Sequence, residues 1–120
     1  MDKTIPLTAI NLVILLSAFS QAATYGGGNG TLSDPYQIWT AGQMSSIGAN
    51  PADWSKNFKL MADVDMSAYT GTQYRIIGNS TTKFTGTFNG NGYVIRNLTY
   101  TTPLAVDYVG LFGWIENAFI

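Results

Sequence analysis

A short pattern recurs at a fixed spacing in this chain and limits the folds that it can adopt. The pattern is an apolar residue, any residue, a small residue, any residue and a second apolar residue, and its copies begin at equal intervals, at Leu60, Phe84 and Tyr108. In a solenoid each turn packs only on its neighbours, so small residues recur where backbones meet. The spacing therefore favours a stacked repeat over a β-sandwich. It predicts that Leu60, Phe84 and Tyr108 lie in register on neighbouring parallel strands.

The segment Asn89-Gly-Asn-Gly92 directly follows the second copy of this pattern. Two glycines one residue apart after a strand can cradle a phosphate, turn a hairpin, or turn a corner between two strands of one coil. No P-loop or dinucleotide-binding spacing follows, and Tyr93 begins a strand pattern rather than a helix, which argues against a phosphate site. Asn-Gly is a strong hairpin signal, so a hairpin is the main rival. The spacing favours a corner in which Gly90 and Gly92 take positive φ.

Two short helical segments are predicted before the strands. Residues 40–43, Thr-Ala-Gly-Gln, fit a capping box and predict a helix through about Ile47 that ends at Gly48. Residues 50–53, Asn-Pro-Ala-Asp, place a cap, a proline and an acid where a second helical turn would begin, and this turn would carry Trp54.

Strands are predicted over most of the remaining chain. Residues 36–39 form a short candidate before the helices. In residues 58–66 an alternation of Phe58, Leu60, Ala62 and Val64 indicates one strand with a buried face. Further candidates, separated by turn residues, are 74–78, 83–88, 93–100 and 107–115.

Residues 1–22 have the features of an export signal. Lys3 precedes an apolar run over residues 12–19, and small residues occupy the two positions that matter for cleavage after Ala22. This run is too short to span a bilayer, so no membrane span is expected once the signal is removed. Residues 23–35 are predicted to be a flexible Gly-rich lead-in, and residues 36–120 a single small domain. The expected localisation is secreted or cell-surface.

The composition excludes several functions. Six Lys and Arg against seven Asp and Glu are scattered along the chain, so no basic patch for nucleic acid is expected. The chain has no His and no Cys, which removes nucleophilic triads and zinc sites. We therefore expect no catalytic residue, no metal and no cofactor.

Two carboxylates form the strongest candidate for chemistry. Asp63 and Asp65 alternate on one strand and would lie on one face, in principle suited to glycoside hydrolysis or part of a calcium site. A carboxylate pair without a cleft is more often a solvated face. We therefore expect solvent-side residues, with Asp65 capping the turn toward Ser67.

Aromatic residues offer a second candidate. Trp39, Trp54 and Trp114 could form a platform for sugar rings, although aromatics at this density also suit a small β core. Core packing is expected for Trp54 and Trp114, while both roles stay open for Trp39.

Three asparagines, Asn29, Asn79 and Asn97, each begin an Asn-x-Thr triplet, the pattern of an N-glycosylation site. We expect turn or strand roles for them. At Asn97 a hydrogen-bonded ladder of asparagines from successive coils is an alternative.

The sequence resembles the bacterial GLUG-repeat proteins. Gly110, Leu111, Phe112 and Gly113 match the four-residue motif of that family, and the upstream phrase around Gly86, Gly90 and Gly92 is similar to the segment that precedes its first repeats, with Asn89 where the family phrase has Asp. The resemblance covers about residues 34–120. It implies a mainly β fold, a right-handed parallel β-helix whose opening coils carry a short helical N-terminal cap.

The resemblance also implies a function. It indicates a non-catalytic exported scaffold or adhesion module that binds carbohydrate or a cell-surface protein, as an N-terminal fragment of a longer protein that continues past Ile120. The alternatives are the N-terminal part of a polysaccharide lyase or hydrolase on the same fold, or a domain that precedes a peptidase. Both would place their catalytic residues beyond Ile120.

Overall fold

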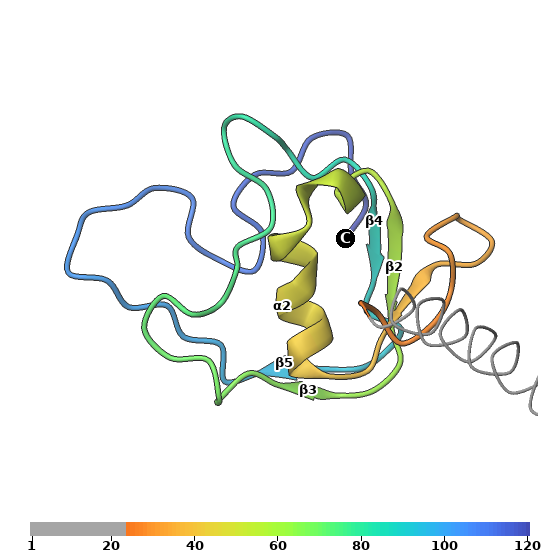
Figure 1. The fold of residues 1–120 in the computed structure, drawn as a ribbon, viewed down its shortest axis with the longest axis horizontal. Helices are drawn as coiled ribbons and strands as arrows, with labels where there is room; N and C mark the ends of the chain where they lie inside the picture. Colours follow the sequence, from red (N-terminus) through yellow and green to blue (C-terminus); the bar gives the residue numbers. More distant parts are fainter. Residues whose placement is uncertain (1–23) are drawn as a thin grey trace, which may run out of the picture.

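The computed structural model describes residues 24–120. The predicted export signal over residues 1–22 lies outside the described residues. The ordered elements are β1 (Tyr36–Ile38), α2 (Ala41–Ala49), the 3-10 turn η1 (Pro51–Asp53), β2 (Asn57–Leu60), β3 (Val64–Asp65), β4 (Thr87–Asn89) and β5 (Ile95–Arg96) (Figure 1).

All strand pairs in the described part of the chain are parallel. One sheet has the order β1-β2-β4, and the other pairs β3 with β5. Further parallel bridges join Ile77 to Phe112, Phe84 to Ile115, and Thr87 of β4 to Phe119. The chain therefore passes the same three places repeatedly, each time beside its previous passage.

The predicted 24-residue register is wrong. Leu60 pairs with Ile38, and Phe84 pairs with Ile115 rather than with Leu60. Tyr108 is 52% exposed and belongs to no strand. The intervals between paired residues vary, because the connecting loops have different lengths while the inward-facing side chains fix the alignment.

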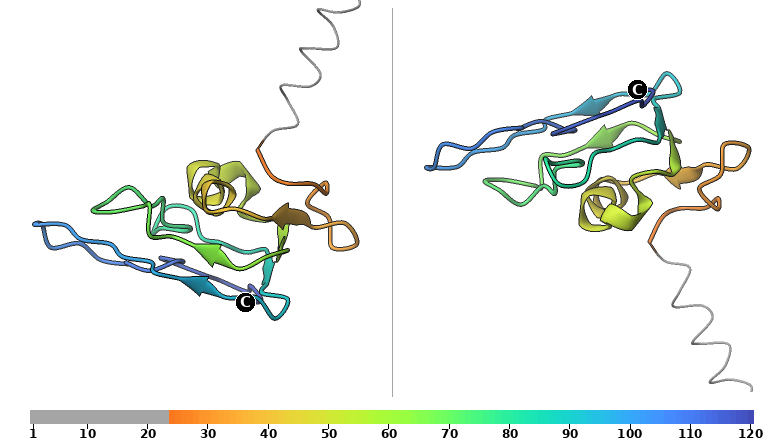
Figure 2. Two further views of the ribbon diagram at one scale, coloured as in Figure 1. Left: turned by 90° about the horizontal axis from the view of Figure 1, so that it is seen from below. Right: turned by 90° about the horizontal axis from the view of Figure 1, so that it is seen from above.

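A single helix lies at one end of these passages. Figure 2 shows α2 at one side, residues 57–80 in the middle and the C-terminal part of the chain at the other side. The helix begins where predicted, because the Thr40 hydroxyl accepts a hydrogen bond from the Gln43 amide at 3.2 Å. The Gln43 side chain makes the second capping contact, in which its oxygen accepts a hydrogen bond from the backbone amide of Trp39, the residue before Thr40, at 2.7 Å.

The predicted end of this helix at Gly48 is wrong by one residue. The helix continues to Ala49, and Asn50 is its C-terminal cap. Gly48 instead lies against the carbonyl of Arg75, where a Cβ atom would collide. Its lack of a side chain lets the helix approach the next segment of chain, and it does not end the helix.

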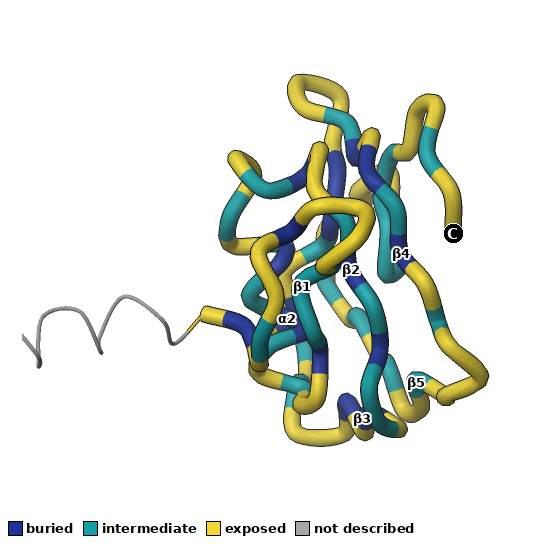
Figure 3. Tube along the Cα trace, turned by 90° about the vertical axis from the view of Figure 1, so that its right-hand side faces the viewer, coloured by how far each residue is buried: buried dark blue, intermediate teal, exposed yellow. Residues whose placement is uncertain are grey.

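The core runs between the helix and the two sheets. Figure 3 shows the buried positions of β1, β2 and β4 along the sheet. Trp54 is 2% exposed, as predicted, and its indole nitrogen donates to the Ile47 carbonyl at 2.7 Å. The tilted rings of Phe58, Phe84 and Phe112 contact one another in turn, with centroids 6.2 and 5.1 Å apart. These aromatic contacts connect successive passages of the chain.

Residues 58–66 form two short strands rather than the single predicted strand. The chain bends between β2 and β3, so Phe58 and Leu60 belong to the first sheet and Val64 to the second. All three are nonetheless buried. The alternation thus predicted the burial of Phe58, Leu60 and Val64 correctly, whereas Ala62, at the corner that the alternation missed, is only partly buried.

The predicted strands at 74–78 and 107–115 do not form, and isolated bridges join Ile77 to Phe112 and Phe84 to Ile115 instead. Residues 24–35, predicted as a flexible lead-in, run beside β1. The Gly26 amide donates to the Gln37 carbonyl and the Gln37 amide to the Gly27 carbonyl, both at 2.8 Å. This segment covers the outer edge of β1.

Candidate functional site

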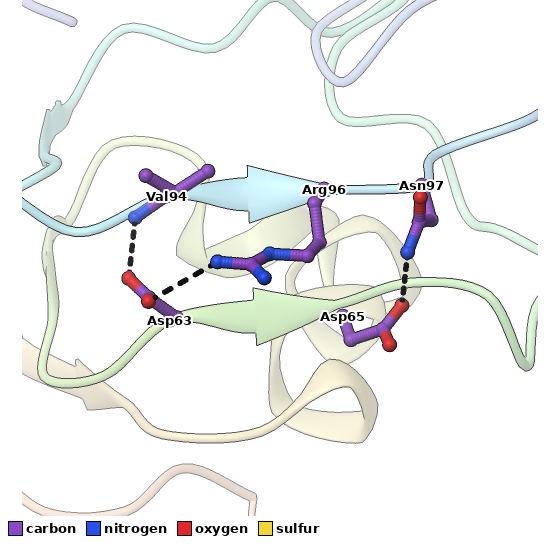
Figure 4. Close-up of polar contacts among 5 residues, drawn as sticks. All are labelled: Asp63, Asp65, Val94, Arg96 and Asn97. Atoms are coloured by element: carbon purple, nitrogen blue, oxygen red, sulfur yellow. Dashed lines mark hydrogen bonds and ion pairs between the residues drawn. The ribbon is translucent and has the colours of Figure 1, made fainter.

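The two candidate carboxylates lie on the β3 side of the β3–β5 pair and face residues of β5 (Figure 4). Asp63 accepts a hydrogen bond from the Val94 amide at 2.9 Å and pairs with Arg96 at 3.3 Å. Both side chains of this ion pair are about half exposed, at 54% and 52%. The pair therefore contributes little Coulomb energy, although the backbone hydrogen bond fixes the start of β5 beside β3.

Asp65 has separate partners. It accepts a hydrogen bond from the Asn97 side-chain amide and one from the Ser67 backbone amide, both at 3.0 Å. The Ser67 contact is the turn cap that the sequence predicts. The Asn97 hydrogen bond, followed by those of Ser67, lowers the pKa of the Asp65 carboxyl below its ordinary value.

These contacts give both acids structural partners. In residues 24–120 no three His, Cys, Asp or Glu side chains gather where they could hold a metal ion. Each carboxylate is occupied by donors from the next passage of the chain. We call Asp63, Asp65, Arg96 and Asn97 the lateral cluster, because it joins two neighbouring strands from the side.

The sequence analysis missed the basic and amide half of the lateral cluster. Val64 pairs with Ile95, which brings Arg96 and Asn97 beside the acids. The available signal was an Asp-x-Asp segment at Asp63 and Asp65, followed much later in the chain by an Arg-Asn pair. The paired residues of the cluster lie 33 and 32 positions apart, outside the 24-residue interval of the repeated pattern.

The corner at Asn89–Gly92 joins β4 of the first sheet to β5 of the second, so it is not a hairpin. Gly92 takes φ 77°, but the second left-handed position is Asn91 with φ 54°, not Gly90 as predicted. Asn91 fits there because its side chain donates to the Leu60 carbonyl at 3.1 Å and its amide donates to the Asn89 side chain at 2.8 Å.

Three of the motif glycines differ in their surroundings. A Cβ atom on Gly86 would collide with the Lys56 carbonyl, whereas Gly90 has no atom within 4 Å of that position. A Cβ atom on Gly113 would lie 2.6 Å from the Gly78 carbonyl oxygen. Gly86 and Gly113 therefore mark close approaches of two backbones.

Leu111 and Gly113 attach the Gly110–Gly113 motif to residues 74–77. The Leu111 carbonyl accepts from the Ile77 amide and from the Tyr74 hydroxyl, both at 3.1 Å. The Gly113 amide donates to the Ile77 carbonyl at 2.7 Å. At Gly110 a Cβ atom would lie 3.2 Å from the Phe112 carbonyl oxygen.

The candidate aromatics separate into different environments. Trp54 belongs to the core, and Trp39 is 45% exposed. Trp114 is only partly buried, contrary to the prediction of core packing, and its ring contacts Tyr108 at 5.1 Å and the Lys83 ammonium at 5.1 Å. Trp39 is therefore the most exposed of the three tryptophans.

The asparagines of the three Asn-x-Thr triplets have turn roles, as predicted. The Asn29 side chain accepts from the Thr31 amide at 3.1 Å, and that of Asn79 accepts from the amides of Thr81 and Thr82 at 3.0 and 2.8 Å. Asn97 takes φ 61° directly after β5 and bonds to Asp65. An acid, rather than a second asparagine, thus lies beside Asn97.

Comparison with known proteins gives two relatives. The chain is 33% identical over 105 residues to a protein of Evansella cellulosilytica named as a Gly-rich membrane protein, a match that covers 84% of this chain and 12% of that protein. It is 36% identical over 100 residues to halomucin of Haloquadratum walsbyi, covering 76% of this chain and 1% of halomucin. The chain therefore spans only a small part of the length of either relative.

Both relatives carry names of membrane or surface-type proteins, which supports a surface or membrane localisation for this chain and agrees with a surface protein. No family model matches the chain, and no solved structure matches it. Within residues 24–120, none of the helices has the length and apolar character needed to cross a bilayer.

Proposed function

We propose that this chain forms the helical cap and the opening coils of an exported right-handed parallel β-helix of the GLUG-repeat type. In this proposal the protein is a non-catalytic scaffold or adhesion module at the cell surface. The observation that carries it is the parallel pairing at three separate places, two sheets and one set of bridges, in which each passage of the chain lies beside an earlier one. Successive coils of a β-helix pair in this way.

The lateral cluster supports a structural role over a catalytic one. General acid–base chemistry needs a carboxyl group that can reach a substrate and whose pKa lies near the working pH. Asp63 and Asp65 instead accept hydrogen bonds from the neighbouring strand, and the pKa of Asp65 is lowered rather than raised. The names of the two relatives support the surface location.

The function is tested with the full chain, including residues 1–22, expressed in a bacterial host with a C-terminal epitope tag. We expect an antibody against the tag to detect the protein on intact cells or in the medium. We also expect the purified protein to leave polysaccharides and peptides uncleaved. Retention of the tagged protein in the cytosol would contradict export. If the wild-type protein cleaved a polysaccharide and the Asp63→Asn or Asp65→Asn variant did not, the non-catalytic proposal would be contradicted.

A further inference from the structure

The outer face of the first sheet carries a row of polar side chains, of which Asn89 also accepts a hydrogen bond from the Asn91 amide at the corner after β4. Gln37, Lys59 and Asn89 lie side by side on β1, β2 and β4, in register. Successive side chains of a strand point to opposite faces. Since the neighbouring Ile38, Phe58, Leu60 and Phe88 are buried, these three side chains point away from the core.

Trp39 adjoins this row and is held in position. Its indole nitrogen donates to the Gln37 side chain at 3.2 Å, so the two side chains lie together on the outside. Its backbone amide is fixed by Gln43, and the edge of its ring lies against Gly26, which has no side chain to displace it. Trp39 is 45% exposed, and an aromatic ring held by its neighbours offers a flat surface that loses little freedom on binding.

The charge of this face differs from that of the whole chain. The outward positions of β1, β2 and β4 are Gln37, Asn57, Lys59, Thr87 and Asn89, one cation and no acid, whereas the chain as a whole carries net charge −1. Asn57 and Thr87 bond to each other at 2.7 Å. Lys59 is therefore an uncompensated cation between two amide side chains on this face.

We propose that this face, with Trp39 as its stacking surface, binds an acidic polysaccharide. The Trp39 ring packs on the apolar face of a sugar, the Lys59 ammonium pairs with a sugar carboxylate, and the Gln37 and Asn89 amides bond to hydroxyls. The one cation of the row, Lys59, has no acid beside it on these strands and therefore favours an acidic sugar over a neutral one. This inference rests on the proposed surface function and names the class of ligand and the residues that bind it.

The test measures binding of the full chain to polygalacturonate by calorimetry and by retardation in a gel that contains the polymer. Methyl-esterified polygalacturonate has the same backbone without the charge and serves as the ligand control. We expect Trp39→Ala to weaken binding about tenfold, and Trp39→Phe to restore part of the loss. Lys59→Gln should weaken binding to the acidic polymer and reduce its dependence on salt.

Two matched variants control for exposure and charge. Tyr93→Ala removes an aromatic residue that is 44% exposed and lies outside the row, and Lys83→Gln makes the same charge change beside Trp114. Neither should change the affinity. Thermal melting of every variant shows whether a loss of binding reflects a loss of folding.

The outcomes separate this inference from the proposed function. Equal binding by Trp39→Ala and wild type, equal binding of the esterified polymer, or no binding by wild type would each overturn the polysaccharide face, while surface exposure of the protein would still stand. Cleavage of the polymer would overturn the non-catalytic function. If Trp39→Ala loses its fold, Lys59→Gln alone decides between the outcomes.

Discussion

Gly86 has no room for a side chain because the Lys56 carbonyl lies where its Cβ would be. This contact joins the segment before β4 to the segment before β2, and the amides of Thr85 and Gly86 both donate to the Trp54 carbonyl, at 2.9 and 3.0 Å. At the residue scale, a glycine such as Gly86 thus lies where two passages of the backbone are in contact.

The first prediction compares two glycines of the same phrase. Gly86→Ala should destabilise the protein by about 1–3 kcal/mol, because backbone must move to admit the methyl group. Gly90→Ala should change stability little, since nothing lies within 4 Å of its Cβ position and its φ is not positive. Urea unfolding of both variants measures the difference. Equal stabilities would show that the backbones are not in contact at Gly86.

The second prediction concerns the pH dependence of Asp65. Its folded-state pKa is lowered, mainly by Asn97, so its contribution to stability is present above the unfolded carboxyl pKa of about 3.9 and is lost as the pH falls through the lower folded value. In Asn97→Gly, which keeps the positive φ accessible but removes the amide, the pKa of Asp65 should rise toward its ordinary value. NMR titration of the Asp65 carboxyl carbon measures this pKa in the wild type and in the variant. A pKa unchanged by this substitution would exclude the hydrogen bond as the main cause.

At the element scale, α2 combines a local start with a tertiary packing role. Thr40 and Gln43 determine where it begins, and the buried Met44 and Ile47 attach it to the core. A helix as short as α2 is marginal alone in water, so packing must supply most of its stability.

The third prediction tests this division in α2. Ile47→Ala should cost about 2–5 kcal/mol, because it removes buried methyl groups and leaves a cavity. Gly42→Ala, in the same helix, should be neutral or stabilising, since its nearest contact would be 3.8 Å away. Thermal unfolding compares the two. A mild effect of Ile47→Ala would mean that the helix does not pack on this core.

The fourth prediction tests the strand register by disulfide formation, for which a chain without Cys is well suited. Lys59 and Asn89 are Cα partners on β2 and β4, so the double variant Lys59→Cys/Asn89→Cys should cross-link on oxidation. Lys59→Cys/Lys83→Cys has the 24-residue spacing of the sequence pattern and should stay reduced. Mass spectrometry after mild oxidation distinguishes them. The opposite result would restore the 24-residue register.

At the scale of the whole molecule, the helix lies at one end and the last passage of the chain at the other (Figure 2). The last passage exposes apolar side chains, including Ile115 at 47% and Phe119 at 79%. Both belong to bridges with the previous passage, so the first sheet and the bridge rows end in apolar residues at this side. Elsewhere in the fold, apolar side chains pack between two passages of the chain. In the last passage, Ile115 and Phe119 contact a neighbouring passage on one side only.

Several parts of the fold could be predicted from the sequence because they depend on nearby residues. Thr40 caps its helix through Gln43 in the first turn, and Asp65 caps the turn at Ser67. Residue type alone did not decide burial, since Trp54 is buried as predicted whereas Trp114 is only partly buried. The buried face of Phe58, Leu60 and Val64 was likewise readable from alternation. The lateral cluster was not, because its halves lie far apart in the sequence and meet only when β3 and β5 align.

The sequence alone determined the local start of the helix, the inward-facing residues of β2 and β3 and the turn at Asn89–Gly92 as a place where the chain changes direction. Only the tertiary structure decided which strand lies beside which. The physical reason is that loops of different length can connect the same pair of strands at small entropic cost, whereas the interlocking of Phe58, Phe84 and Phe112 in the core permits one alignment. The recurrent pattern that predicts a 24-residue period marks inward-facing residues correctly at Leu60 and Phe84, but the packing of those residues sets the register.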